Sequence, residues 1–187
     1  DIQKKLYSVK NAKIQYKGID FLSQGIKITP AKVSGQHLSI TGDINHKTIN
    51  LDSEQLSIFF KQGSENFKNV KLSSDNSFKL YIKKNKIKSY HIDSKIKLDK
   101  LNYKIDIAKL KNYIPSYNGF IDFQDHDIDL TIKKKKLSIK GIGNYLIGTT
   151  SEIVSYDIIN KDGNFRFQSK ININKNPLRI EFLNYKK

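Results

Sequence analysis

The sequence predicts an all-β protein: a long antiparallel sheet, strongly twisted and curled, with one short helix. Apolar and polar residues alternate over most of the chain, as in Ile128, Leu130 and Ile132, and alternate residues of a strand share one face. Short polar turns join these runs, so neighbouring strands are expected to be antiparallel. Only 37% of the residues are hydrophobic, which suits a sheet with one apolar face and one solvent-exposed polar face.

In the first half of the chain, alternation predicts strands near residues 9–16, 26–28, 38–40, 49–51, 70–72, 78–82 and 90–98. Pro30 ends the second of these, because proline cannot donate to a central ladder. We expect turns at residues 42–43 and 73–76 and a hairpin turn at 83–86. The apolar run 56–60 fits a strand or a short helix.

In the second half, strands are expected near residues 101–107, 120–123, 128–132, 137–139, 156–158, 165–173 and 178–182. A break is expected at residues 99–100. Apolar residues three and four apart predict a short helix over 108–113, ending before Pro115. Asp162-Gly163 is a hairpin-turn signal. Gly141 and Gly143 indicate a bend or bulge, and residues 125–127 a solvated turn.

We expect one domain over residues 1–187, with a possible subdivision near the loop at 61–66. The chain has no cysteine, which excludes disulfides and thiolate metal sites. It has no methionine and begins at Asp1, so we expect a fragment or a processed form. No stretch has the length of a signal-peptide core or a membrane span.

No pattern in the sequence predicts catalysis, a metal site or a cofactor. The four histidines lack the spacing of a helical zinc site, and no serine lies in a nucleophile-elbow motif. Asp127 and Asp129 share a face, but paired carboxylates are ordinary on the wet side of a sheet. We therefore expect a protein that is not an enzyme.

The net charge of +16 has two interpretations. It can indicate an anionic partner, either a nucleic acid or a lipid headgroup surface. It can also reflect composition, since lysine, isoleucine and asparagine are abundant together and lysine protects exposed sheet edges. Only Arg166 and Arg179 are arginines, and base readout favours arginine. We therefore expect no nucleic-acid partner.

A long sheet with one apolar side must cover that side with helices, another sheet or a ligand. The pattern predicts only one short helix, so the sheet either curls on itself or exposes an apolar groove. A groove of aliphatic and aromatic side chains with a lysine-rich exterior suits acyl chains with anionic headgroups. The candidate lining residues are Phe78, Leu80, Ile82, Ile96, Leu98, Ile128, Leu130, Ile132, Leu137, Ile139, Phe165, Phe167, Ile171, Ile173, Leu178, Ile180 and Phe182. We expect Phe165, Phe167, Ile171 and Ile173 to lie on the buried face.

From about Leu101 to its end, the chain resembles the AsmA-like superfamily, in particular the branch that contains the YhdP and TamB envelope proteins. The resemblance is carried by YKIDIAKLKNYIPSYNG (103–119), DHDIDLTIKKKKLSIKGIGNYLIG (125–148) and FRFQSKININKNPLRIEFLNYKK (165–187). It implies a periplasmic protein, anchored in the inner membrane by parts outside this chain. It also implies a β-groove that carries phospholipid towards the outer membrane without chemistry. Family members are far longer, so this chain would be one segment.

Two other function classes stay open at this point. One is a structural or interaction module of the cell envelope, built as a closed sandwich or barrel with a dry core. The other is a basic nucleic-acid-binding module, which would need lysines clustered on one face beside exposed aromatic side chains.

Overall fold

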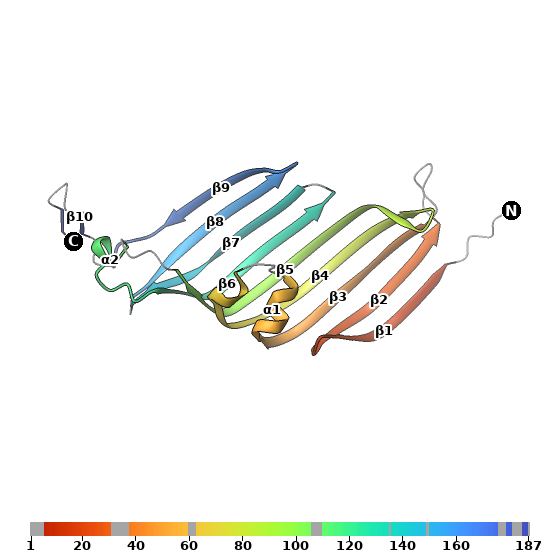
Figure 1. The fold of residues 1–187 in the computed structure, drawn as a ribbon. Helices are drawn as coiled ribbons and strands as arrows, with labels where there is room; N and C mark the ends of the chain where they lie inside the picture. Colours follow the sequence, from red (N-terminus) through yellow and green to blue (C-terminus); the bar gives the residue numbers. More distant parts are fainter. Residues whose placement is uncertain are drawn as a thin grey trace.

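The computed structural model describes residues 6–30, 38–59, 63–105, 110–134, 136–148, 150–175, 179–180 and 185–186. In these residues nine strands form one antiparallel sheet, and each strand pairs with the next along the chain (Figure 1). The strands are β1 (Tyr7–Tyr16), β2 (Ile19–Pro30), β3 (Leu38–Leu51), β4 (Phe67–Lys83), β5 (Lys86–Lys104), β6 (Phe120–Lys133), β7 (Lys136–Ile147), β8 (Thr150–Lys161) and β9 (Asn164–Ile171). Because β1 and β9 lie at opposite edges, the sheet is not closed. The all-β prediction is confirmed.

Three short helices and a separate two-stranded sheet complete the described structure. Helix α1 (Ser53–Phe59) and the 3₁₀ helix η1 (Ser64–Asn66) join β3 to β4, and α2 (Leu110–Tyr113) lies between β5 and β6. Strands β10 (Arg179–Ile180) and β11 (Tyr185–Lys186) pair only with each other. The ambiguous run at 56–60 is therefore helical as far as Phe59. The helix predicted at 108–113 is confirmed from Leu110 onward, and residues 106–109 lie outside the described part.

The strands are longer than the sequence predicted, because several expected turns lie inside them. Residues 42–43 are in β3, 73–76 in β4, 99–100 in β5 and 125–127 in β6, so these turn or break predictions were wrong. Polar side chains in these positions bond across to a neighbouring strand. The Asp43 carboxylate, for example, accepts hydrogen bonds from the backbone N–H groups of Gln24 (2.8 Å) and Gly25 (3.0 Å). Near 99–100 the ladder has a bulge instead of a break.

Tight turns with left-handed backbone close the hairpins. Lys84 and Asn85 have φ values of 49° and 57°, and Asp162 and Gly163 have 51° and 86°. Two consecutive residues with positive φ make the turn whose twist matches that of the flanking strands. Both hairpin-turn predictions are therefore confirmed. Lys17 and Gly18 join β1 to β2 in the same way.

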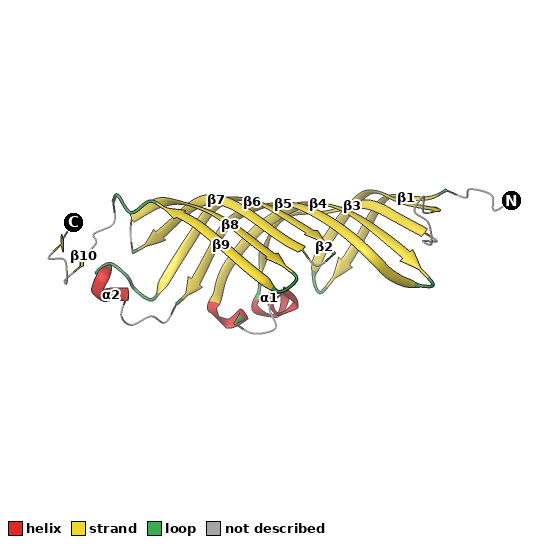
Figure 2. Cartoon of the chain, turned by 90° about the horizontal axis from the view of Figure 1, so that it is seen from above, coloured by secondary structure: helices red, strands yellow, loops and turns green. Residues whose placement is uncertain are grey.

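The connections alternate between two ends of the sheet, because consecutive strands run in opposite directions. The β4–β5, β6–β7 and β8–β9 turns lie at one end, which we call the hairpin end (Figure 1). Helices α1 and α2 lie at the other, the helix end. Turned by 90°, the sheet shows a strong twist, with both helices on the same side of it (Figure 2).

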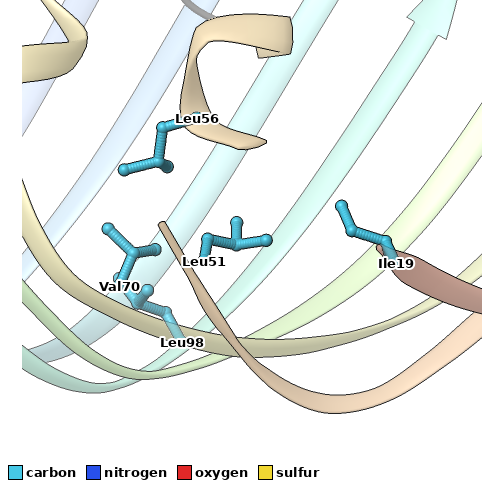
Figure 3. Packing of buried hydrophobic residues seen from close by; sticks show 5 residues of the cluster. All are labelled: Ile19, Leu51, Leu56, Val70 and Leu98. Carbon is cyan, nitrogen blue, oxygen red and sulfur yellow. The ribbon is translucent and has the colours of Figure 1, made fainter. Parts of the chain in front are cut away.

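The buried core is confined to the helix end. Leu56 of α1 is 3% exposed and packs on Ile19, Leu51, Val70 and Leu98 from four strands (Figure 3). Asp52 and Gln55 hold the start of α1 reciprocally: the Gln55 N–H donates to the Asp52 carboxylate (2.8 Å), and the Asp52 N–H donates to the Gln55 amide oxygen (3.1 Å).

A second cluster lies under the chain that follows α2. It contains Tyr117, Tyr145, Ile147 and Val154. The Tyr117 hydroxyl donates to the Ile105 carbonyl, and the Tyr145 hydroxyl donates to the Asn172 carbonyl at 2.6 Å. Both tyrosines thus bury their rings while keeping a partner for the polar tip.

Candidate functional site: an open apolar face

The strand register places apolar side chains from neighbouring strands directly beside one another. One row runs Phe78, Ile92, Ile132 and Leu137 across β4 to β7. A second row runs Leu130, Ile139, Ile158 and Phe167 across β6 to β9. Both rows lie on the face that α1 and the Leu56 cluster occupy at the helix end. We call the part of this face towards the hairpin end the apolar face.

Most of the predicted lining residues share this face. Those in β4 to β7 are partly exposed, apart from Leu98, which lies beneath α1 and is 7% exposed. In the described part of the chain, the helices pack only towards the helix end. The predicted residues of the apolar face are Phe78, Leu80, Ile82, Ile96, Ile128, Leu130, Ile132, Leu137, Ile139, Phe165, Phe167 and Ile171.

The C-terminal predictions need correction. Phe165, Phe167 and Ile171 are 71%, 65% and 55% exposed, so they are not buried, because β9 is an edge strand with nothing described above it. Ile173 follows β9, outside the sheet, and is 42% exposed. Ile180 belongs to the separate pair β10–β11. Leu178 and Phe182 lie outside the described residues.

Several further residues of the apolar face were absent from the predicted set, among them Ile40, Ile44, Ile92 and Ile158. The register pairs Ile40 with Leu80 and Ile158 with both Ile139 and Phe167. Their alternation with polar neighbours was visible in the sequence. The sequence does not give the pairing of the strands. Alternation within one strand separates its two faces, but it does not say which of them lies beside the apolar face of a neighbouring strand.

A buried histidine lies between the apolar face and the second cluster. His126 is 2% exposed, so the predicted solvated turn at residues 125–127 is wrong for its central residue. Its Nε2 lies 2.9 Å from the Asn144 carbonyl oxygen and its Nδ1 lies 3.3 Å from the Tyr156 hydroxyl. Since a carbonyl only accepts, Nε2 carries the proton and Nδ1 accepts from Tyr156.

Burial favours the neutral form of both of these groups. Desolvation lowers the pKa of His126 below its ordinary value, outweighing the bond to Asn144 and the charge of Asp125. Desolvation also raises the pKa of Tyr156 to about 12. A neutral pair joined by one hydrogen bond suits an apolar surrounding, so we assign these side chains to packing.

Gly141 and Gly143 make room for these two rings. A Cβ at Gly141 would lie 2.3 Å from the Tyr156 ring, and one at Gly143 would lie 2.3 Å from the His126 ring and 2.7 Å from its Cα. The expected bulge is present: between Gln124 and Asp127, β6 has two residues where β7 has only Gly143.

The opposite face of the sheet carries mainly polar and charged side chains. Asp75, Lys95, Asp129, Lys140 and Asp157 are successive cross-strand neighbours from β4 to β8, so their charges alternate along one row. Opposite charges directly across a ladder stabilise it. The Lys140 Nζ atom lies 3.6 Å from the Asp157 Oδ2 atom, so these two side chains form an ion pair. The contrast between the two faces matches the one-sided alternation of the sequence.

The apolar residues form an open surface more than an enclosed cavity. A hollow of about 620 Å³ beside α1 includes Leu51, Leu56 and Phe67 in its lining, together with polar residues. Another of about 640 Å³ lies over the polar residues of β3 to β6, including Asp43, Asp93 and Asp129. In the described residues, no three histidine or carboxylate side chains are grouped so as to hold a metal ion.

Comparison with known proteins adds no relative. The chain matches no family model, no curated protein and no solved structure. Among the described helices, none has the length and apolar character needed to cross a membrane.

Proposed function

We propose that the apolar face binds the acyl chains of a phospholipid or similar lipid, and that the protein carries lipid without chemical change. The supporting observation is that contiguous apolar rows lie on one face of an open sheet with no described element over them. The six strands β4 to β9 span about 24 Å at the usual strand spacing. Exposed apolar surface of this extent is unusual in a protein that has no partner for it.

The cellular setting is part of the same proposal. The resemblance of residues 101–187 to AsmA-like proteins supports a segment of a periplasmic, inner-membrane-anchored protein that moves phospholipid towards the outer membrane. A sheet that stays open along its length, with successive strands adding to the same face, suits a surface along which an acyl chain slides. The closed sandwich or barrel considered above has no support in this sheet, in which the described strands β1 and β9 lie at opposite edges and do not pair with each other.

The test places charge on the proposed surface. Leu130 and Ile139 are cross-strand partners on the apolar face. In the double variant Leu130→Asp, Ile139→Asp, we expect lipid co-purifying with the protein, measured by mass spectrometry, to fall at least about tenfold. Two carboxylates under an acyl chain lose hydration without gaining a partner.

The matched control carries the same two charges on the polar face. Ile142 and Ile153 lie there and are 54% and 50% exposed, so Ile142→Asp, Ile153→Asp should retain the bound lipid. If the Leu130, Ile139 variant keeps its lipid while remaining folded by circular dichroism, or if the wild-type protein captures none, the proposal is wrong.

A further inference from the structure

We propose that the hairpin end of the sheet is a docking edge for an anionic lipid surface. Nine lysines gather there, from three hairpins that are far apart in sequence. Eight are exposed, and Lys83 is partly exposed. The lysine edge comprises Lys79, Lys83, Lys84, Lys86, Lys88, Lys133, Lys134, Lys136 and Lys161.

Part of this edge is a row of like charges. Lys133 pairs directly with Lys136 across β6 and β7, and Lys136 pairs with Lys161 across β7 and β8. At the tip of the β4–β5 hairpin, Lys83 pairs with Lys86. Like charges opposite each other destabilise a sheet. The row from Asp75 to Asp157, nearer the middle of the same face, alternates in sign. By contrast, Lys133, Lys136 and Lys161 have no carboxylate among their cross-strand partners.

The lysine edge also lacks carboxylate partners in the described residues. None of its nine lysines forms an ion pair with a carboxylate in the described part of the chain. Lysines at the helix end, by contrast, do form ion pairs. Lys17 Nζ lies 3.7 Å from Glu54 Oε1, and Lys71 Nζ lies 3.5 Å from Asp99 Oδ2. A hollow of about 470 Å³ on the β4–β5 hairpin is lined by Lys83, Lys84, Lys86 and Lys88 alone.

Exposed apolar side chains at the same edge favour a lipid surface over a nucleic acid. Ile87 lies between Lys86 and Lys88 and is 59% exposed, and Phe165, beside the β8–β9 turn, is 71% exposed. Lysines flanking an isolated exposed aliphatic residue match interfacial binding, in which buried apolar area adds to attraction by anionic lipids. The lysine edge is also where the apolar face ends, so a docked membrane would meet that face directly.

The experiment compares two sets of four neutralised lysines. The edge variant carries Lys84→Gln, Lys86→Gln, Lys133→Gln and Lys136→Gln. The control carries Lys68→Gln, Lys100→Gln, Lys104→Gln and Lys111→Gln at the helix end, and loses the same net charge. Binding is measured by flotation with vesicles of phosphatidylcholine, alone or mixed with phosphatidylglycerol.

We expect wild-type binding only to the vesicles that contain phosphatidylglycerol, weakening as salt is raised. The edge variant should lose at least about tenfold in affinity, since each lysine near an anionic surface contributes separately. The control should lose less than about threefold. Equal losses in both variants, or equal wild-type binding to the two vesicle types, would overturn the proposal.

Two further measurements separate the alternatives. Ile87→Ser should weaken vesicle binding but leave binding to a single-stranded oligonucleotide unchanged. If the oligonucleotide binds more tightly than the anionic vesicles and loses affinity in the edge variant, the edge is a nucleic-acid surface and the proposal is wrong. The edge variant should keep its co-purifying lipid, because the apolar face is untouched, so failure of docking is distinguishable from failure of acyl-chain binding.

Discussion

At the scale of single residues, His126 makes stability depend on pH. Burial lowers its pKa in the folded protein, so between the unfolded value of about 6.5 and the folded value the unfolded chain binds more protons. We therefore expect the free energy of unfolding to fall as the pH drops from about 7.5 to about 5.5. Urea unfolding at a series of pH values measures this.

The substitution His126→Gln removes the titration while leaving an amide that can still donate to Asn144. Its stability should change less with pH than that of the wild type. The control is His46→Gln, which replaces a histidine of β3. This variant should keep the pH dependence of the unfolding free energy that His126 causes. If the unfolding free energy of His126→Gln varies with pH as much as that of the wild type, His126 is not the cause of the pH dependence.

At the scale of elements, α1 is the piece that closes the helix end. Leu56→Ala should cost about 2–5 kcal/mol of unfolding free energy, because the side chain is 3% exposed among four strands. Asp52→Ala should cost about 1 kcal/mol by removing the helix cap. Leu22→Ala is the control: its side chain is 43% exposed, so the loss should stay below about 1 kcal/mol. Urea unfolding of the three variants checks this order, and equal costs for Leu56→Ala and Leu22→Ala would contradict it.

At the scale of the whole molecule, stability should decline from the centre of the sheet to its edges. Strands β4, β5 and β6 pair on both sides, while β1 and β9 pair on one, and every residue of β9 is exposed. Hydrogen exchange followed by mass spectrometry should find the slowest amides in β4 to β6 and the fastest in β1 and β9, because edge strands open without disturbing the rest. Uniform protection across the nine strands would be inconsistent with this arrangement.

The alternation of side chains by itself determined much of this protein. It predicted the all-β class, the two hairpin turns at 83–86 and 162–163, and the one-sided apolar pattern, because period-two patterning and turn chemistry are local properties of the chain. At Gly143 the sequence predicted a bend or bulge, but it did not predict the close packing of the His126 ring against this glycine.

Only the tertiary structure decided how these pieces pair. Pairing with β3 and β5 keeps residues 67–83 in one strand despite the polar stretch 73–76. The pairing of β6 to β8 also buries His126 against Tyr156. Phe165 and Phe167 stay exposed because β9 is an edge strand. The strand pairing also brings lysines from three hairpins to one end of the sheet. These outcomes depend on contacts between residues far apart in sequence, and a pattern within one strand carries no information about its neighbours.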